Sequence, residues 1–251
     1  MSDASIDRAW PAPAATALDD RRLTECYALD RGRRSLRVNF ISSLDGAATV
    51  GGLSGGLSGA ADKRVFDILR RLCDVVLVGA GTVRAEGYGA MRLDPAAVQW
   101  RRANGLADQP VFAIVSAALH LDPDSAVFTE APVKAVLVTI GASASAQREA
   151  LSRVADVLVC GDGRLDVPVM LRELAARGLR QVLCEGGPTL FGALLDADCV
   201  DELCLTLSPR IEAGKAPRIA AGALAQARRM RLQHALVSGS TLLLRYQRMP
   251  W

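Results

Sequence analysis

Residues 179–192 read LRQVLCEGGPTLFG, and this stretch is the most informative part of the chain because an apolar run stops at two adjacent glycines and restarts with helical character. The pattern predicts a strand that passes directly into a helix. Gly186 and Gly187 carry no side chain, so an anion can approach the backbone near the positive end of the helix dipole. Pro188 suits a first helical turn, where its missing N–H costs little. The stretch therefore predicts a phosphate site.

A second junction of this kind follows the apolar residues 74–78, where Gly79-Ala80-Gly81-Thr82 turns a predicted strand toward a helix. One short glycine motif more often reflects tight packing than a ligand. Two such junctions in one alternating sheet, with hydroxyls from Thr82 and Thr189, suggest the two ends of one large phosphate-bearing ligand, and a dinucleotide fits. The chain has no GxGxxG after its first strand and no GxxxxGK[ST], which excludes the Rossmann fingerprint and the P-loop.

The rest of the chain alternates between predicted strands and helices. Strands are predicted at 36–43, 74–78, 111–116, 135–139, 157–160 and 181–184, and helices at 60–72, 143–153, 166–177 and 188–196. This alternation implies crossover connections and a largely parallel sheet. Residues 202–208, and the pair 231–237 and 241–248 around a Ser238-Gly239-Ser240 turn, predict antiparallel C-terminal strands.

We expect one α/β domain over residues 35–251, preceded by a leader, residues 1–34, that is partly loose or drapes over the fold. Residues 49–59 contain five glycines, which is typical either of a mobile loop over a ligand or of a flexible connector.

Composition argues against several classes of function. The net charge is +3, from 30 basic and 27 acidic residues without a long basic block, so neither a nucleic-acid nor a membrane surface is expected. The six cysteines lie mostly in apolar runs and predict reduced, buried thiols. There is no CxxC, and the two histidines, His120 and His234, lie far apart, so no metal site is expected. Without a signal peptide or a long apolar span, we expect a cytoplasmic protein.

Five landmarks occur in a specific order and spacing: Ser43-Leu44-Asp45-Gly46 after the first long strand, a helix with Arg70, the turn Gly79–Thr82 followed by Glu86, a strand ending in Ser116, and Glu185–Leu190. On these residues the chain resembles the pyrimidine reductases of riboflavin biosynthesis, whose reductase domain is a relative of dihydrofolate reductase. The resemblance covers about residues 36–248. It implies a dihydrofolate reductase-like three-layer sandwich and a homodimer, with the C-terminal strands as a candidate subunit contact. No HxE with PCxxC is present, so a stand-alone reductase without the zinc deaminase domain is expected.

The resemblance further implies NADPH-dependent reduction of the ribosyl group of a ribosylamino-pyrimidine phosphate to a ribityl chain. It assigns cofactor contacts to Ile41, Gly79, Gly81, Thr82, Glu86, Ser116, Gly186, Gly187, Pro188, Thr189 and Leu190, and substrate contacts to Ser54, Arg70, Arg92 and Glu185. Arg70 or Arg92 is expected to hold the 5′-phosphate, because arginine makes bidentate contacts with phosphate. Arg70 on a solvated helix face is the alternative.

Asp45 and Glu185 are the acids at the mouths of the motif strands, and we expect both to be catalytic residues. Glu185 would bind the polar pyrimidine, and Asp45 would orient or relay a proton; Asp45 could equally cap its own turn. Asn39 is a departure, because family members commonly carry lysine at that position, and it puts the substrate in doubt. Two alternatives remain open: a reductase of dihydrofolate or a related pterin, and a non-catalytic NADP-binding sensor. Retention of the substrate-side residues argues against the sensor.

Overall fold

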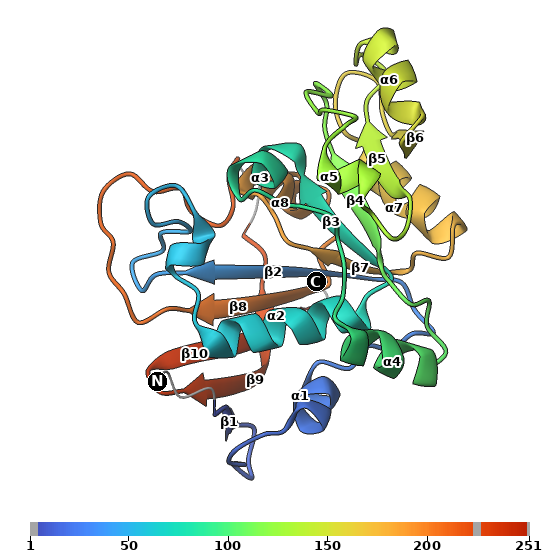
Figure 1. Ribbon diagram of the computed structural model, residues 1–251. Helices are drawn as coiled ribbons and strands as arrows, with labels where there is room; N and C mark the ends of the chain where they lie inside the picture. The colour runs from blue at the N-terminus through green and yellow to red at the C-terminus, as the bar shows by residue number, and fades with distance from the viewer. Residues whose placement is uncertain (1–4, 223–226, 250–251) are drawn as a thin grey trace.

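The computed structural model describes residues 5–222 and 227–249, and a mixed ten-stranded sheet runs through this part of the chain (Figure 1). The strand order across the sheet is β1-β9-β10-β8-β2-β7-β3-β4-β5-β6. The strands are β1 (Asp7–Trp10), β2 (Ser35–Ser42), β3 (Val75–Gly79), β4 (Val111–Val115), β5 (Ala135–Thr139), β6 (Ala155–Val159), β7 (Gln181–Cys184), β8 (Glu202–Leu207), β9 (Met230–Ser238) and β10 (Thr241–Arg248).

The sheet is mostly parallel. The strands from β8 through β2, β7, β3, β4 and β5 to β6 pair in parallel, and the antiparallel strands β10, β9 and β1 complete the other edge. The predicted architecture, a mostly parallel sheet with antiparallel C-terminal strands, is confirmed. β8 differs in detail from the expectation, since it pairs antiparallel with β10 but parallel with β2. A helix connects β7 to β8, and such a crossover returns the chain in its original direction.

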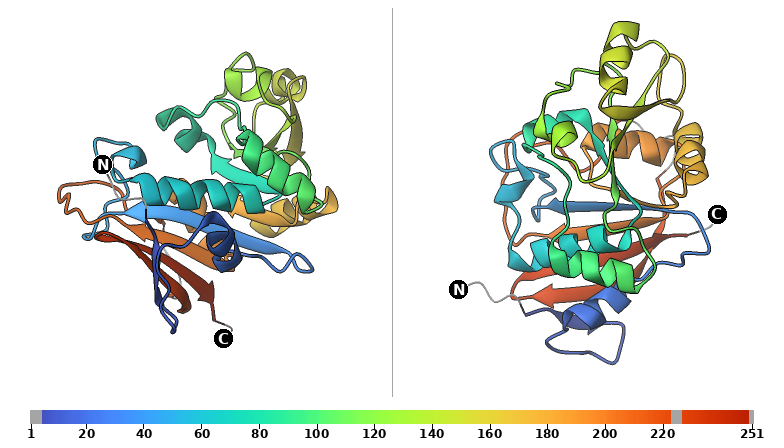
Figure 2. Two further views of the ribbon diagram at one scale, coloured as in Figure 1. Left: turned by 60° about the horizontal axis from the view of Figure 1, so that its bottom comes forward. Right: turned by 45° about the vertical axis from the view of Figure 1, so that its right-hand side comes forward.

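Helices cover both faces of the sheet, which gives three layers (Figures 1 and 2). The helices are α1 (Asp20–Cys26), α2 (Ala60–Leu72), α3 (Ala80–Ala85), α4 (Pro95–Ala103), α5 (Ala126–Thr129), α6 (Ser145–Ser152), α7 (Val167–Ala176) and α8 (Pro188–Asp196). α1, α2 and α4 pack in one core, and α7 and α8 pack in the other. In the described residues, no helix is both long and apolar enough to cross a membrane.

The amphipathic helix α2 is the element that positions the site. Val65, Ile68, Leu69 and Leu72 are buried against the sheet, as the helical spacing predicts. On the face of α2 away from this apolar stripe, polar residues lie beside the ends of β2 and β7. α2 therefore forms one wall of the space that the site occupies.

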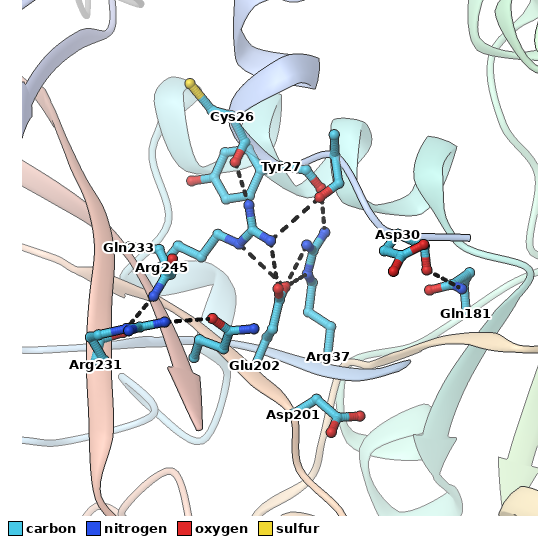
Figure 3. A network of polar contacts seen from close by, with 12 residues as sticks. Cys26, Tyr27, Asp30, Arg37, Gln181, Asp201, Glu202, Arg231, Gln233 and Arg245 are labelled. Carbon is cyan, nitrogen blue, oxygen red and sulfur yellow. Dashed lines mark hydrogen bonds and ion pairs between the residues drawn. The ribbon is translucent and has the colours of Figure 1, made fainter. Parts of the chain in front are cut away.

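The N-terminal segment, residues 5–34, is built into the sheet edge. β1 pairs with β9, and Leu23 and Tyr27 are buried in the core that α2 shares. Arg37 and Arg245 donate hydrogen bonds to the carbonyl oxygens of Tyr27 and Cys26, which fastens the end of α1 to β2 and β10 (Figure 3). The β1–β9 pairing and the contact between Arg245 and Cys26 join residues far apart in the sequence, so local periodicity could not reveal them.

The cysteines are free thiols, as predicted, and four of the six are buried. Burial raises the pKa of Cys184 to about 12, which keeps this thiol protonated and unreactive at neutral pH.

Candidate active site

A cavity of about 940 Å³ opens at the carboxyl ends of β2, β3 and β7, between α2 and the glycine-rich loop of residues 49–59. Ligands of open parallel sheets bind at this end of the strands, and the volume suits a cofactor-sized ligand. Most of the predicted site residues line the cavity: Ile41, Ser54, Arg70, Gly79, Gly81, Thr82, Glu86, Glu185, Gly187, Pro188, Thr189 and Leu190.

The two glycine turns lie side by side, because β3 and β7 are neighbouring parallel strands. The Gly79 N–H donates a hydrogen bond of 2.7 Å to the carbonyl oxygen of Gly186. A Cβ atom on Gly187 would lie 2.4 Å from Oγ1 of Thr82, so any larger residue at position 187 would force a shift. The two junctions that the sequence places about 100 residues apart thus form one continuous wall.

The first turn of α8 is open toward a ligand. Gly187 is the N-cap of the helix and provides no side-chain hydrogen bond, and Pro188 occupies the first turn. The free amides of this turn and the positive end of the helix dipole favour an anion. Pro188, Thr189 and Leu190 line the cavity, so this end of α8 faces the space where a ligand would lie.

Arg70, Glu185 and Tyr88 form a hydrogen-bonded cluster on the cavity wall. Arg70 donates from Nε to Oε1 and from Nη2 to Oε2 of Glu185, each at 2.7 Å, and the Tyr88 hydroxyl donates to Oε2 at 2.9 Å. Burial opposes the charge of Arg70, but the neighbouring Glu185 raises its pKa above the ordinary value. Burial and the Glu185 carboxylate raise the pKa of Tyr88 well above its usual range. Arg70 is therefore a cation, and Tyr88 keeps its proton.

The aromatic neighbours of Arg70 fix the guanidinium in place. It lies over the ring of Phe66, 4.1 Å from the ring centre, and near the ring of Tyr88. The Tyr88 ring in turn stacks on Phe112. The solvated-face alternative for Arg70 does not hold, because its side chain is only 18% exposed and is engaged on both sides.

The glycine-rich loop covers the cavity and is anchored to Glu86. The Ser54 N–H donates to Oε1 of Glu86 at 2.8 Å, and a short 3-10 turn spans Ser54–Gly56. Thr49 and Ser58 of the same loop also line the cavity. Of the two alternatives for this segment, the structure favours the loop over a ligand.

Asp45 lies outside the cavity lining. Its carboxylate accepts the Ser43 hydroxyl and the backbone N–H groups of Glu212 and Ala213. These hydrogen bonds lower its pKa to about 2. Such a carboxylate is a poor proton relay at neutral pH. Within its own turn Asp45 accepts only the Ser43 hydroxyl, and the amides that it caps belong to the loop after β8. The carboxylate thus joins the loop after β2 to the loop after β8, which run beside each other in Figure 1.

Three other predicted residues lie off the lining. Arg92 is exposed and donates from Nη2 to the carbonyl oxygen of Glu130. Ser116 accepts the Leu119 N–H on its hydroxyl, and its chain neighbours Val115 and Ala117 line the cavity instead. Gly186 contributes through its carbonyl, which is held by Gly79 as described above.

Tyr88, Phe66, Lys63 and Asn39 line the cavity as well, and no role was assigned to the first three from the sequence. Lys63, Phe66 and Arg70 have the i, i+3, i+7 spacing of one helix face, so helical periodicity could have identified them. Tyr88 follows Gly87 in an irregular segment, where no periodic signal exists.

The chain is similar to known proteins in sequence and in fold. The RibD C-terminal domain family model matches residues 34–244. The chain is 30% identical over 218 residues to a 2,5-diamino-6-ribosylamino-4(3H)-pyrimidinone 5′-phosphate reductase of Methanothermobacter thermautotrophicus, covering 83% of this chain and 95% of that protein. It is 29% identical over 184 residues to the riboflavin biosynthesis protein RibD of Bacillus amyloliquefaciens, covering 72% of this chain and 47% of that protein. A solved pyrimidine reductase-like protein of Corynebacterium diphtheriae has a TM-score of 0.80 and 26% identity, covering 87% of this chain and 93% of that chain.

Proposed function

This chain belongs to the RibD C-terminal domain family, and from that premise we propose that it reduces the ribosyl group of a ribosylamino-pyrimidine 5′-phosphate to a ribityl chain in riboflavin biosynthesis. We propose NADPH as the reductant. The observation that carries the proposal is the joining of both glycine turns, through Gly79 and Gly186, on the wall of a cavity that also holds Arg70 and Glu185.

The residues of the two turns fit a dinucleotide. The space beside Gly187 admits backbone only, and the first turn of α8 offers amides that no side chain caps. Thr82 and Thr189 add hydroxyl donors to the same wall. We assign the phosphate groups of NADPH to these residues, and the remaining cofactor contacts to Ile41, Gly81 and Glu86.

When bound, NADPH supplies the hydride for C1′ of the opened sugar. The protein supplies position and electrostatics, which is how cofactor enzymes of this kind act. Glu185 accepts hydrogen bonds from the N–H groups of the pyrimidine. The free Nη1 of Arg70 donates a hydrogen bond to the same ring. Phe66, Tyr88 and Leu190 belong to the apolar part of the lining, which would keep water from the reacting carbon once substrate and cofactor are bound.

Turnover tests this assignment. Purified protein is mixed with NADPH and either the 2,5-diaminopyrimidinone or the aminouracil form of the ribosylamino 5′-phosphate, and the loss of nicotinamide absorbance is followed. We expect turnover of one or both pyrimidines and none of dihydrofolate. Turnover of dihydrofolate alone would support the pterin reductase, and tight NADPH binding without any turnover would support the sensor.

The glycine cradle has its own test. Gly187→Val is expected to raise the Kd for NADPH about tenfold or more, because the new side chain must displace Thr82 and block the phosphate path; tenfold corresponds to about 1.4 kcal/mol. Titration of nicotinamide fluorescence measures it. Gly163→Val is the matched control, since its Cβ would meet nothing within 4 Å. An unchanged Kd in Gly187→Val would contradict the cradle.

We also propose that the protein is a homodimer. Leu203, Leu205 and Leu207 of β8 lie opposite Tyr246, Leu244 and Leu242 of β10, and these side chains are half-buried or exposed. An apolar sheet face of this kind is typical of a subunit contact. Light scattering of the wild type and of Leu205→Lys tests this, and a monomeric wild type would contradict it. We place the protein in the cytoplasm, where its free thiols stay reduced.

A further inference from the structure

We propose that Asp45 is a positioning residue, whose carboxylate ties together two loops that form one lip of the cavity and keeps that lip in place for the substrate. The inference rests on the proposed function, which it deepens by naming a residue outside the cavity on which the site depends. The lip consists of residues 43–49 after β2 and residues 208–217 after β8. Ala48 of the first loop and Pro217 of the second line the cavity.

Backbone hydrogen bonds join the two loops at both ends of the lip. The Leu44 N–H donates to the carbonyl oxygen of Arg210, and the Ala48 N–H donates to the carbonyl oxygen of Pro217, each at 2.8 Å. The second of these bonds lies on the cavity lining itself. The stretch of the second loop between Arg210 and Pro217 needs a further contact to hold its path.

Asp45 provides that contact. Its Oδ1 accepts the Glu212 N–H at 3.2 Å, and its Oδ2 accepts the Ala213 N–H at 2.7 Å. The buried Ser43 hydroxyl donates to Oδ1 and thereby fixes the direction of the carboxylate. In the described part of the chain, no other side chain hydrogen-bonds across the lip. Bonds to a charged acceptor are about twice as strong as neutral ones, so this carboxylate is an effective pin.

The second loop has a shape that it would not keep without support. Ala213 and Gly214 have φ values of +54° and +69°, in the left-handed region that a residue with a Cβ atom, such as alanine, rarely adopts. Ile211 is 75% exposed, so burial of its side chain contributes little to holding the loop. Removal of the carboxylate should therefore free this loop and, through Pro217, the edge of the cavity.

The place of the lip in the sheet indicates which ligand it affects. The strands run in the order β8-β2-β7-β3, so the lip at β8 and β2 lies across β7 from the turn after β3. We assigned the phosphate groups of NADPH to the turns after β3 and β7. A loose lip should therefore affect the substrate more than the cofactor. It must be ordered each time a substrate binds, and ordering a loop weakens binding.

Steady-state kinetics test the proposal. Asp45→Ala is expected to raise KM for the pyrimidine about tenfold and to change the Kd for NADPH less than about threefold. Asp45→Asn should raise KM only about threefold, since its amide oxygen still accepts a backbone N–H. A variant that was merely less stable would lose kcat with KM unchanged. Asp30→Ala is the matched control, because Asp30 accepts the Gly32 N–H at 3.0 Å in a turn before β2, at the opposite end of that strand.

The same variants separate positioning from proton transfer. The pKa of about 2 keeps Asp45 charged throughout the working range, so the pH dependence of kcat should be the same in the wild type and in Asp45→Asn. A proton relay at Asp45 would make Asp45→Asn lose kcat as fully as Asp45→Ala, and that result would overturn the proposal. An unchanged KM in Asp45→Ala would overturn it as well.

Limited digestion with trypsin tests the pin without turnover. Arg210, Lys215 and Arg218 are exposed cleavage sites in or beside the second loop. Faster cleavage there in Asp45→Ala than in the wild type and Asp30→Ala would support the proposal, and equal rates would overturn it. A wild-type protein that turns over neither pyrimidine refutes the proposed function instead, and the digestion then still decides whether Asp45 holds the two loops together.

Discussion

Two arginine–glutamate clusters lie on the side of the sheet that α1 and α2 cover. In the first, which we call the anchor cluster, Glu202 of β8 accepts from Arg37 of β2 and Arg245 of β10 (Figure 3). In the second, the cavity cluster, Glu185 accepts from Arg70 and Tyr88. The chemistry of both is a carboxylate held by guanidinium groups. Their remaining hydrogen-bonding capacity is what differs.

In the described residues, every guanidinium nitrogen of the anchor cluster donates a hydrogen bond. Arg37 also donates to the Tyr27 carbonyl at 3.0 Å, and Arg245 to the Cys26 carbonyl at 2.6 Å. The side chains of Arg37 and Glu202 are only 3% and 8% exposed. These hydrogen bonds and ion pairs fasten the end of α1 to the sheet.

The cavity cluster keeps an unused donor group. Nη1 of Arg70 makes no hydrogen bond to any described residue. Arg70 and Glu185 both line the cavity. We therefore infer a structural role for the anchor cluster and a ligand-binding role for the cavity cluster.

The largest expected effect is on the anchor cluster. Glu202→Ala leaves two buried guanidinium groups without a counter-charge and should lower the free energy of unfolding by about 3–5 kcal/mol. Urea denaturation measures this. Glu173→Ala, which breaks the exposed pair with Arg177, is the control and should cost less than about 0.5 kcal/mol. A loss below about 1 kcal/mol for Glu202→Ala would remove the structural role of the anchor cluster.

The second prediction concerns acid sensitivity at the anchor cluster. His234 lies edge-on to Tyr27 with its Nε2 buried and unpartnered. Burial, and then repulsion by Arg245, Arg37 and Arg8, lower the pKa of His234 to about 4, with Glu202 acting in the opposite direction. The unfolded chain therefore binds this proton first as the pH falls.

Stability should accordingly be intact above pH 6.5 and fall by about 3 kcal/mol as the pH drops from 6.5 to about 4. His234→Gln has no proton to gain and should flatten this part of the curve. The difference between the two unfolding curves isolates His234 from the carboxylates that titrate in the same range. Identical slopes in both proteins would show that His234 does not carry the effect.

The third prediction reverses the pattern at the cavity cluster. Glu185→Gln is expected to lower kcat/KM about 100-fold, or about 2.7 kcal/mol, because the amide accepts less strongly from the pyrimidine and no longer balances Arg70. Its unfolding energy should change less than that of Glu202→Ala, since water in the cavity can reach Arg70. Steady-state kinetics and urea denaturation on the same preparation separate the two effects. A variant that is unstable but fully active per folded molecule would place Glu185 with the anchor cluster.

The sequence predicted the cavity cluster better than the anchor cluster, for a physical reason. The limits of α2, β5, β7, α8 and β10 agree with the local patterns, because an apolar stripe or run is a property of a short segment. The glycine turns that follow β3 and β7 could be predicted for the same reason. The shared cavity follows once a parallel sheet brings those strands together.

Contacts between distant segments could not be predicted from the sequence. β1 and α1 are held by β9 and by Arg37 and Arg245, up to about 230 residues away, so the leader showed no pattern of its own. The positions of Arg92 and Asp45 in the sequence predicted a role in the site. In the structure, however, Arg92 donates to an exposed backbone carbonyl and Asp45 accepts from two backbone amides. Only the three-dimensional structure shows which charges are still free.

The smallest predicted effect tests how the cavity cluster is tuned. Tyr88→Phe keeps the stacking on Phe112 and the ring beside Arg70 but removes the hydroxyl that donates to Glu185. Since Arg70 still holds both carboxylate oxygens, the loss should be about 1 kcal/mol, or roughly fivefold in kcat/KM, with NADPH binding unchanged. In the Glu185→Gln background the same change should cost less, because the two residues act through one contact. Additive losses in the double variant would mean that Tyr88 touches the substrate itself and does not work by orienting Glu185.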